Sequence, residues 1–118
     1  MIYEQLKTQL TAQGYKCVTV TDGLEGLKTA KKIAPDLIVL DVMLPSMNGF
    51  KICRLLKFDK RYLNTPIIML TSRSENADRK LGISTGADVY MTKPFEFENL
   101  LTEIRRLLRD KSEVKQSV

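Results

Sequence analysis

Residues 36–41 read Asp-Leu-Ile-Val-Leu-Asp, which places four apolar residues between two aspartates. A short continuous apolar run predicts a strand that is covered on both faces, as in the middle of a parallel sheet. Pro35 precedes this run, and a loop containing Pro, Asn and Gly follows it at 45–49. The stretch therefore predicts a central strand that ends at Asp41.

Helix-like and strand-like segments alternate on both sides of this strand. Apolar spacing and stop signals predict helices over 2–13, 22–33, 49–58, about 76–86 and 95–109, and further strands over 16–20, 66–70 and 89–92. Asp22 and Glu25 form a capping-box pattern, with Leu24 and Leu27 on the apolar side of that helix. Such alternation predicts an α/β fold with a doubly wound parallel sheet, whose chemistry lies at the carboxyl ends of the strands.

Length and composition indicate one soluble domain. The chain has 118 residues, a net charge of +5, two cysteines and no histidine. We expect the domain to span 1–110, and residues 111–118 to be a tail or the start of a linker. The sequence predicts no membrane span and no secretory leader, so we expect a cytoplasmic protein. Positive residues occur in every helix-like segment, and direct nucleic-acid binding by this domain is not expected.

Three polar residues stand at the predicted carboxyl ends of strands: Asp41, Thr71 and Lys93. A carboxylate can attack phosphorus, an ammonium can neutralise the transferred group, and a hydroxyl can hydrogen-bond one of its oxygens. Each residue also has a simpler interpretation: Asp41 could cap a turn, Thr71 could cap the following segment, and Lys93 could be a solvated surface lysine. Their combination favours a phosphoryl site.

The same residues carry a family resemblance. The stretches LIVLDVMLPSMNGF, PIIMLTSR and GADVYMTKPF resemble the signature motifs of response-regulator receiver domains. The resemblance implies a flavodoxin-like fold in which Asp41 is the phospho-acceptor, Thr71 the switch hydroxyl and Lys93 the phosphoryl-pairing lysine. It also implies that Tyr90 is the switch aromatic, although an ordinary strand aromatic remains open, and that Met43 offers its backbone carbonyl to Mg²⁺.

The sequence departs from the family pattern at its beginning. A complete receiver starts with an apolar strand that ends in an acidic pair, and the family strand order is 2-1-3-4-5. Here the first predicted element is a helix, so the first strand is absent from this chain, and Asp41 with one carbonyl would bind Mg²⁺ weakly. We expect an upstream segment to supply the strand. A second copy that donates a strand, or direct pairing of the neighbouring strands, are the alternatives.

The predicted function is that of a signalling switch in a two-component system. The resemblance implies that Asp41 receives a phosphoryl group from a sensor histidine kinase or a phosphotransfer protein, and that the surface at 76–109 then changes its affinity for partners. A homodimer or strand-swapped dimer could form through 76–109 or through the gap. The alternative is a pseudo-receiver that binds proteins without phosphorylation. An independent enzyme is not expected, because the chain has no histidine base, no GxSxG turn and no Gly-rich phosphate loop.

Overall fold

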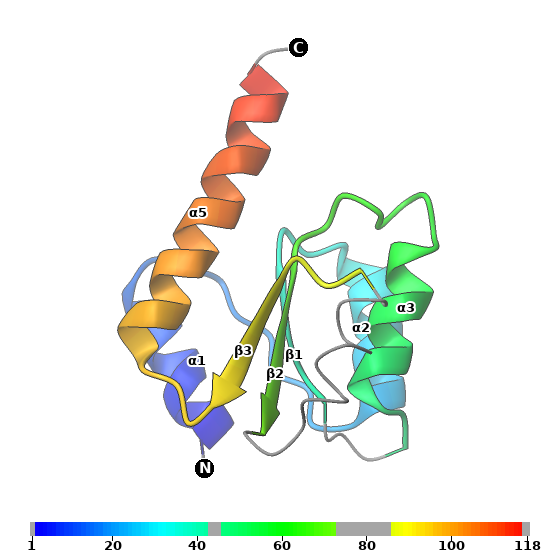
Figure 1. Cartoon of the computed structure of the whole chain (residues 1–118), viewed down its shortest axis with the longest axis horizontal. Helices are drawn as coiled ribbons and strands as arrows, with labels where there is room; N and C mark the ends of the chain where they lie inside the picture. The colour runs from blue at the N-terminus through cyan, green and yellow to red at the C-terminus, as the bar shows by residue number, and fades with distance from the viewer. Residues whose placement is uncertain (1, 43–45, 73–85, 117–118) are drawn as a thin grey trace.

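Helices and strands alternate along the chain. The structure is a computed structural model that describes residues 2–42, 46–72 and 86–116. Its helices are α1 (Ile2–Ala12), α2 (Gly23–Ile33), α3 (Gly49–Lys57) and α5 (Phe97–Gln116), and its strands are β1 (Ile38–Asp41), β2 (Ile67–Ser72) and β3 (Val89–Lys93). Figure 1 shows the strands between two groups of helices. The helix predicted over 76–86 lies almost wholly outside the described residues.

The three strands form one parallel sheet in the order β1-β2-β3. The register pairs Asp41 with Leu70 in the first ladder, and Ser72 with Lys93 in the second. Helices α1 and α5 lie on one side of the sheet and α2 and α3 on the other (Figure 1). This arrangement confirms the predicted parallel sheet, and it brings the carboxyl ends of all three strands to one edge.

Each face of the sheet has its own apolar core. The core under α2 and α3 consists of Leu27, Ala30, Leu40, Val42, Phe50, Ile52, Cys53, Leu56, Tyr62, Ile67 and Met69. The core under α1 and α5 consists of Leu10, Ile68, Leu70, Leu100, Leu101, Ile104 and Leu107. Residues of β2 alternate between the two cores, as the two-residue period of a strand requires. Strand β2 therefore lies in the middle of the described sheet, whereas β1, which the sequence predicts as the central strand, lies at its edge because no described segment pairs with its other side.

The ends of α2 and α3 follow from their capping residues. The Asp22 carboxylate accepts a hydrogen bond from the backbone N–H of Glu25 at 3.0 Å, which confirms the predicted N-cap. The Asn48 side chain accepts one from the N–H of Phe50 at 2.7 Å and begins α3. Ala34 adopts a left-handed conformation with φ of 46°, which ends α2 before Pro35.

The strand predicted over 16–20 is wrong. Residues 15–20 have no regular secondary structure, and among the described residues β1 pairs only with β2. A strand is defined by backbone hydrogen bonds to a neighbour, and β-branched residues such as Val18 and Val20 favour a strand only where that neighbour is present. The prediction that Leu24 packs in the core is also wrong, because its side chain is exposed.

Helix α5 is longer than predicted. The sequence predicts its end near Arg109, but the helical backbone continues to Gln116. Most of the predicted tail at 111–118 is thus helical, and Ser117 and Val118 lie outside the described residues. Among the described helices, none is long and apolar enough to cross a membrane.

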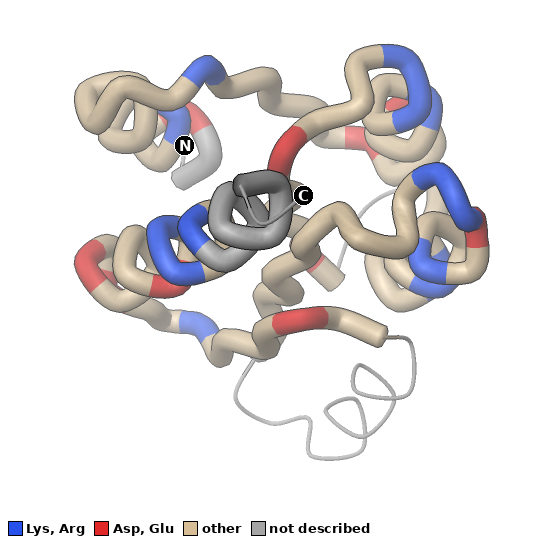
Figure 2. The backbone as a smooth tube through the Cα atoms, turned by 90° about the horizontal axis from the view of Figure 1, so that it is seen from above, with Lys and Arg blue, Asp and Glu red and all other residues tan. Residues whose placement is uncertain are grey.

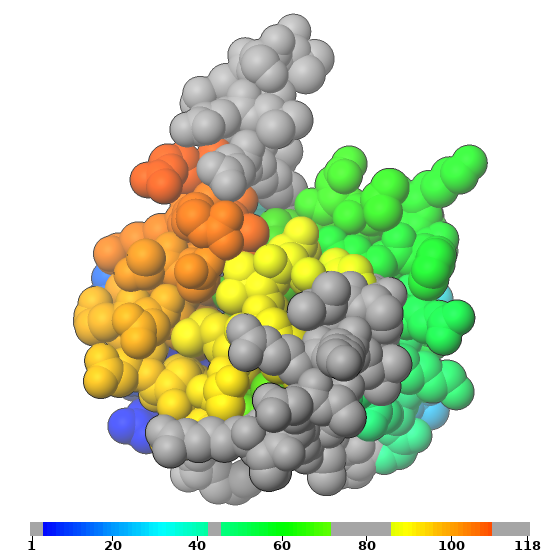
Figure 3. All heavy atoms as spheres, in the orientation of Figure 1, coloured from blue at the N-terminus to red at the C-terminus, as the bar shows by residue number. Residues whose placement is uncertain are grey.

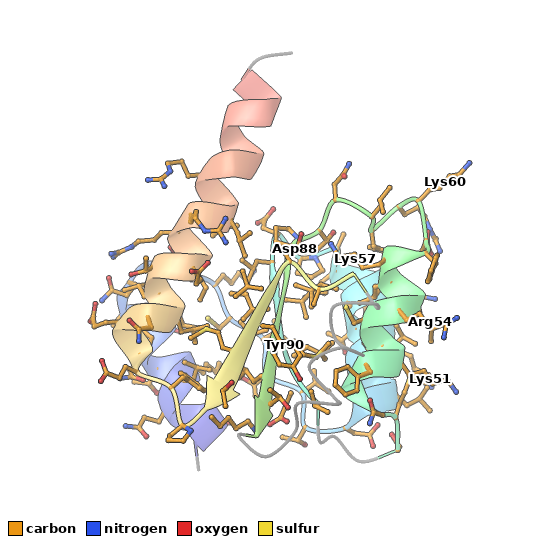
Figure 4. The ribbon with its side chains drawn as sticks, in the orientation of Figure 1. Lys51, Arg54, Lys57, Lys60, Asp88 and Tyr90 are labelled. Carbon is orange, nitrogen blue, oxygen red and sulfur yellow. The ribbon has the colours of Figure 1, made fainter. Side chains whose placement is uncertain are left out.

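A partly exposed ion pair joins α3 to the start of β3. The Lys57 ammonium lies 2.8 Å from the Asp88 carboxylate and donates to the backbone carbonyl of Thr65, also at 2.8 Å. The same Asp88 oxygen accepts the N–H of Ile67 at 2.8 Å. Figure 4 shows Lys57 and Asp88 pointing toward each other. The pair fixes the amino-terminal end of the sheet, opposite the predicted site.

A cavity separates the segment at 15–20 from β1. Its volume is about 650 Å³, and its walls include Lys16–Val20 on one side and Leu37–Asp41 on the other. The outer backbone edge of β1 faces this space rather than another strand. Because Asp41 belongs to the wall, the cavity reaches the carboxyl end of β1.

Candidate functional site

Asp41 is the last residue of β1, and its side chain is only 4% exposed. A buried carboxylate costs several kcal/mol unless it is paired, so its surroundings must supply a cation or hydrogen bonds. The N–H of Gly49 donates to the Val42 carbonyl at 3.0 Å, which brings the start of α3 close to this position. A Cβ atom at Gly49 would lie 2.3 Å from the Asp41 carbonyl oxygen. Glycine therefore permits this close approach.

Lys93 pairs with Asp41 from across the sheet. Its Nζ atom lies 2.5 Å from Asp41 Oδ2, although the two residues belong to β3 and β1 and β2 runs between them. The Lys93 side chain is 34% exposed, so its ammonium can be reached from solvent. The peptide bond to Pro94 is cis. The structure thus brings together two of the three residues that the strand-end rule selects.

Thr71 lies at the same edge of the sheet, between the two charged residues. It follows Leu70, the register partner of Asp41, and it precedes Ser72, the register partner of Lys93. Thr71 as a whole residue is only 3% exposed. A hydroxyl, a carboxylate and an ammonium are therefore present on three adjacent strands at one end of the sheet.

Tyr90 lies on β3, three residues before Lys93, and packs against the core under α2 and α3. Its hydroxyl is buried and has no hydrogen-bond partner among the residues that the structure describes. Burying an unpaired hydroxyl costs about 1–3 kcal/mol. The inward position of this ring, visible in Figure 4, is thus held by packing and not by a hydrogen bond.

Sequence reasoning missed Ser46, which joins the loop after β1 to the start of α2. Its hydroxyl donates to Asp22 Oδ1 at 2.7 Å and accepts the N–H of Leu24 at 3.2 Å. The N–H of Glu25, followed by the Ser46 hydroxyl, holds the pKa of Asp22 below its usual value. No local pattern marks Ser46, because its partners are more than 20 residues away in sequence.

The described residues do not form a magnesium site by themselves. In the parts of the chain with described coordinates, there is no cluster of three or more His, Cys, Asp or Glu side chains that could hold a metal. Magnesium requires an octahedral set of oxygen ligands, and Asp41 is one carboxylate. The predicted carbonyl ligand, Met43, lies outside the described residues. The donor set that is present therefore does not fit the ion.

A carboxylate and an ammonium thus meet at the carboxyl edge of a parallel sheet with helices on both faces, which is the edge where α/β proteins bind their ligands. The sequence profile described as the response regulator receiver domain matches residues 1–105. The chain belongs to the response regulator receiver domain family. It is thus a receiver domain of two-component signalling, a class of signalling phospho-acceptors and not of classical enzymes.

The relatives agree with this family. The chain is 38% identical over 98% of its length to a DNA-binding dual master transcriptional regulator, RpaA of Synechocystis, and covers 48% of that protein. It is 45% identical over 88% of its length to the alkaline phosphatase synthesis transcriptional regulatory protein PhoP of Bacillus subtilis, and covers 42% of it. The chain therefore spans less than half the length of these relatives.

Solved structures confirm the fold. The signal receiver domain of a histidine kinase from Syntrophus aciditrophicus is 35% identical and superposes with a TM-score of 0.86 over 92% of this chain and 82% of that one. The receiver domain of the Pseudomonas aeruginosa sensor kinase PA1611 is 27% identical, with a TM-score of 0.78 over 91% of this chain and 85% of that one. That structure has a magnesium ion coordinated in its active-site cleft.

Proposed function

We propose that Asp41 accepts a phosphoryl group from a phosphohistidine on a sensor kinase or a phosphotransfer protein. A carboxylate oxygen attacks phosphorus, the P–N bond of the donor breaks, and the imidazole leaves with the electron pair and takes up a proton. The product is an acyl phosphate on Asp41. The observation that carries this proposal is the direct contact between the buried Asp41 carboxylate and the Lys93 ammonium.

Lys93 has a separate role before and after transfer. In the present structure its ammonium neutralises the Asp41 carboxylate, and after transfer it would neutralise an oxygen of the phosphoryl group. Because the lysine side chain is long and one-third exposed, its ammonium can move by the small distance that this exchange requires. Lys93 thus stabilises charge without taking part in bond making.

Thr71 and Tyr90 would couple phosphorylation of Asp41 to a structural change at the protein-binding surface. The Thr71 hydroxyl would hydrogen-bond a phosphoryl oxygen, and Tyr90 would move into the space that this shift leaves. The unpaired Tyr90 hydroxyl supports a second position for this ring, because no hydrogen bond to a described residue has to break. The readout surface is the one predicted around 76–109, of which the structure describes 86–109.

A strand in the cavity beside β1 would complete the site. We propose that a segment preceding Ile2 supplies it, as the sequence analysis expects. A parallel strand in this place would end near Asp41, and Figure 1 shows the start of α1 at the end of the sheet to which the strands point. The connection to α1 would therefore be short. Acidic residues at the end of such a strand would add oxygen ligands beside Asp41.

Radioactive labelling with a phosphorylated kinase tests the role of Asp41. On the chain completed by its first strand, we expect a label that is not acid-stable and that hydroxylamine removes, and we expect no label on the Asp41→Asn variant of that chain. Asp22→Asn is the matched control, because asparagine also caps helices and Asp22 lies outside the Asp41–Lys93 contact. Label that survives Asp41→Asn would exclude Asp41 as the acceptor.

The second candidate function is a pseudo-receiver that binds proteins without phosphorylation. It is favoured by one observation, the absence of a metal-binding cluster among the described residues. Beryllofluoride with magnesium discriminates between the two. Widespread amide shifts in NMR spectra support the switch, and an unchanged spectrum supports the phosphorylation-independent module.

Location and assembly complete the proposal. We place the domain in the cytoplasm, where sensor kinases present their phosphohistidine, and we expect dimers through 76–109 or through the cavity beside β1. Light scattering at increasing protein concentration detects either dimer. If the first strand is supplied within the same chain, a strand-swapped dimer should no longer form. The molecular mass measured by light scattering should then stay constant as the protein concentration rises.

A further inference from the structure

Helix α3 has an outer stripe that the fold does not use. Lys51, Arg54, Leu55 and Phe58 follow one another at helical spacing and are all exposed, while the opposite side of the helix packs into the core. Leu55 is 43% exposed and Phe58 is 75% exposed. We call these four residues the outer stripe of α3. Two cations, Lys51 and Arg54, are thus followed by two large apolar side chains, Leu55 and Phe58, along one exposed line of the helix.

The net charge of the chain lies on this side of the molecule. Segments 23–36 and 49–65 contain eight Lys or Arg and three Asp or Glu, whereas the remainder contains eleven of each. The excess of +5 therefore belongs to α2, α3 and the loops that follow them, although positive residues occur in every helix-like segment. Figure 2 shows these cations on the α2 and α3 side of the sheet.

Exposed apolar residues gather in the same two segments. Among the described residues, five of the six exposed large hydrophobic side chains lie here: Leu24, Ile33, Leu55, Phe58 and Leu63. Figure 3 shows the side chains of α3 and the loop after it along one edge of the molecule. Apolar surface surrounded by charge of one sign is typical of a binding surface.

Internal contacts do not account for the cations of the stripe. Lys57 and Arg61 have structural partners in Asp88 and Asp59. Within the described parts of the chain, Lys51, Arg54 and Lys60 form no ion pair, and Figure 4 shows all three pointing outward. The helix dipole favours a cation in the last turn, but it disfavours Lys51 in the first turn of α3.

One part of the stripe is already ordered for binding. The Arg54 guanidinium carbon lies 5.8 Å from the centre of the Phe58 ring, in a cation–π contact. This contact restricts both side chains before any partner arrives, which lowers the entropic cost of binding. Arginine and aromatic residues are also the types most often found at the energetic centre of protein interfaces.

We propose that the outer stripe of α3, together with Lys60 and Leu63 in the following loop, binds an acidic amphipathic helix of a partner protein. Apolar side chains of that helix would contact Leu55 and Phe58, and flanking carboxylates would pair with Lys51, Arg54 and Lys60. A helix fits because Lys51, Arg54, Leu55 and Phe58 lie along one line at helical spacing, so that carboxylates of a partner helix can reach the cations while its apolar side chains contact Leu55 and Phe58.

The test uses a synthetic peptide of about 16 residues with leucine at i, i+3 and i+7 and glutamate on the flanking positions. Binding to the full chain is measured by fluorescence anisotropy, against a scrambled peptide of the same composition. We expect saturable binding of the amphipathic peptide alone. Phe58→Ser and the double variant Arg54→Glu/Lys60→Glu should each raise the dissociation constant about tenfold or more.

Lys7→Glu on α1 is the control for charge reversal, because it replaces one cation by a carboxylate at an exposed residue of another helix. It should leave binding within about twofold, with circular dichroism showing that every variant is folded. Equal binding of both peptides, no saturable binding, or equal affinity in the Phe58 variant would overturn the proposal. Tighter, Phe58-dependent binding to phosphatidylserine vesicles or to a DNA duplex would overturn it in favour of that partner class.

Discussion

At the scale of single residues, the contact between Asp41 and Lys93 is the interaction on which the site depends. The carboxylate is almost fully buried and its cation comes from a strand that is not its neighbour. Removing one member of such a pair leaves an uncompensated charge, whereas removing both does not. Substitutions of the two residues should therefore have coupled effects on the free energy of unfolding as well as on the chemistry of the site.

A double-mutant cycle measures this coupling. We expect Lys93→Met to lower the free energy of unfolding by about 1–3 kcal/mol, less than for a fully buried pair because Lys93 is partly solvated. In an Asp41→Asn background the same change should cost about 0.5 kcal/mol or less, since asparagine carries no charge to leave unpaired. Urea unfolding gives all four values. Additive effects of the two changes would contradict a direct interaction.

Asp59 provides a residue-scale test by pH. The hydrogen bonds from the Arg61 side chain, followed by that from its backbone N–H, lower the pKa of Asp59 from 3.8 to about 2. A lowered pKa in the folded state contributes stability above pH 4 that is lost as the pH falls from about 4 through about 2. Arg61→Gln should return this pKa toward 3.8, as NMR titration of the Asp59 carboxyl carbon would show. Arg54→Gln, also on the exposed side of this region, should leave the titration unchanged.

Asp41 and Lys93 could be predicted from sequence because a parallel sheet brings its strand ends to one edge, so that local patterns suffice. Ser46 and the Lys57–Asp88 pair could not. Their partners lie 22 to 31 residues away in sequence, and no local period indicates which distant carboxylate a serine or lysine will contact. The sequence can therefore predict which side chains lie close together where the sheet topology alone brings them together.

At the scale of elements, the starts of helices could be predicted from local sequence, whereas one predicted strand does not form. A capping residue such as Asp22 or Asn48 acts within three residues of its own position, so that the sequence contains the whole interaction. A strand depends on a neighbour that the segment itself does not encode. The run at 16–20 has suitable residues, but in the described structure the cavity lies where a pairing strand would be.

The approach of α3 to β1 leads to an element-scale prediction. A Cβ at Gly49 would meet the backbone of Asp41, whereas one at Gly26 in α2 would have open space. We expect Gly49→Ala to destabilise the fold by about 1–3 kcal/mol through displacement of the β1 end. Gly26→Ala should instead stabilise it by about 0.5–1 kcal/mol through helix propensity. Thermal unfolding compares the two, and a stabilising Gly49→Ala would contradict the close approach.

At the scale of the whole molecule, the two faces of the sheet differ in charge, and the sheet has an open edge at β1. The α2 and α3 side carries the excess cations and the exposed apolar residues, while the cavity interrupts the sheet beyond β1. An open edge of a strand exposes unpaired N–H and C=O groups and favours association with other strands. Filling the cavity should therefore change both the stability and the association of the chain.

The last prediction concerns a chain extended before Met1 by an apolar strand of about five residues and a short connection to α1. Parallel pairing with β1 would satisfy its free edge and bury apolar surface against Val39 and Leu70, both of which belong to the cavity wall. After the entropic cost of ordering the added residues, we expect the free energy of unfolding to rise by about 2–5 kcal/mol. A Gly/Ser extension of equal length is the control, and urea unfolding with light scattering is the measurement. Equal stability of the two extended chains would show that the cavity does not accept an apolar strand, because only the apolar extension buries apolar surface when it pairs with β1.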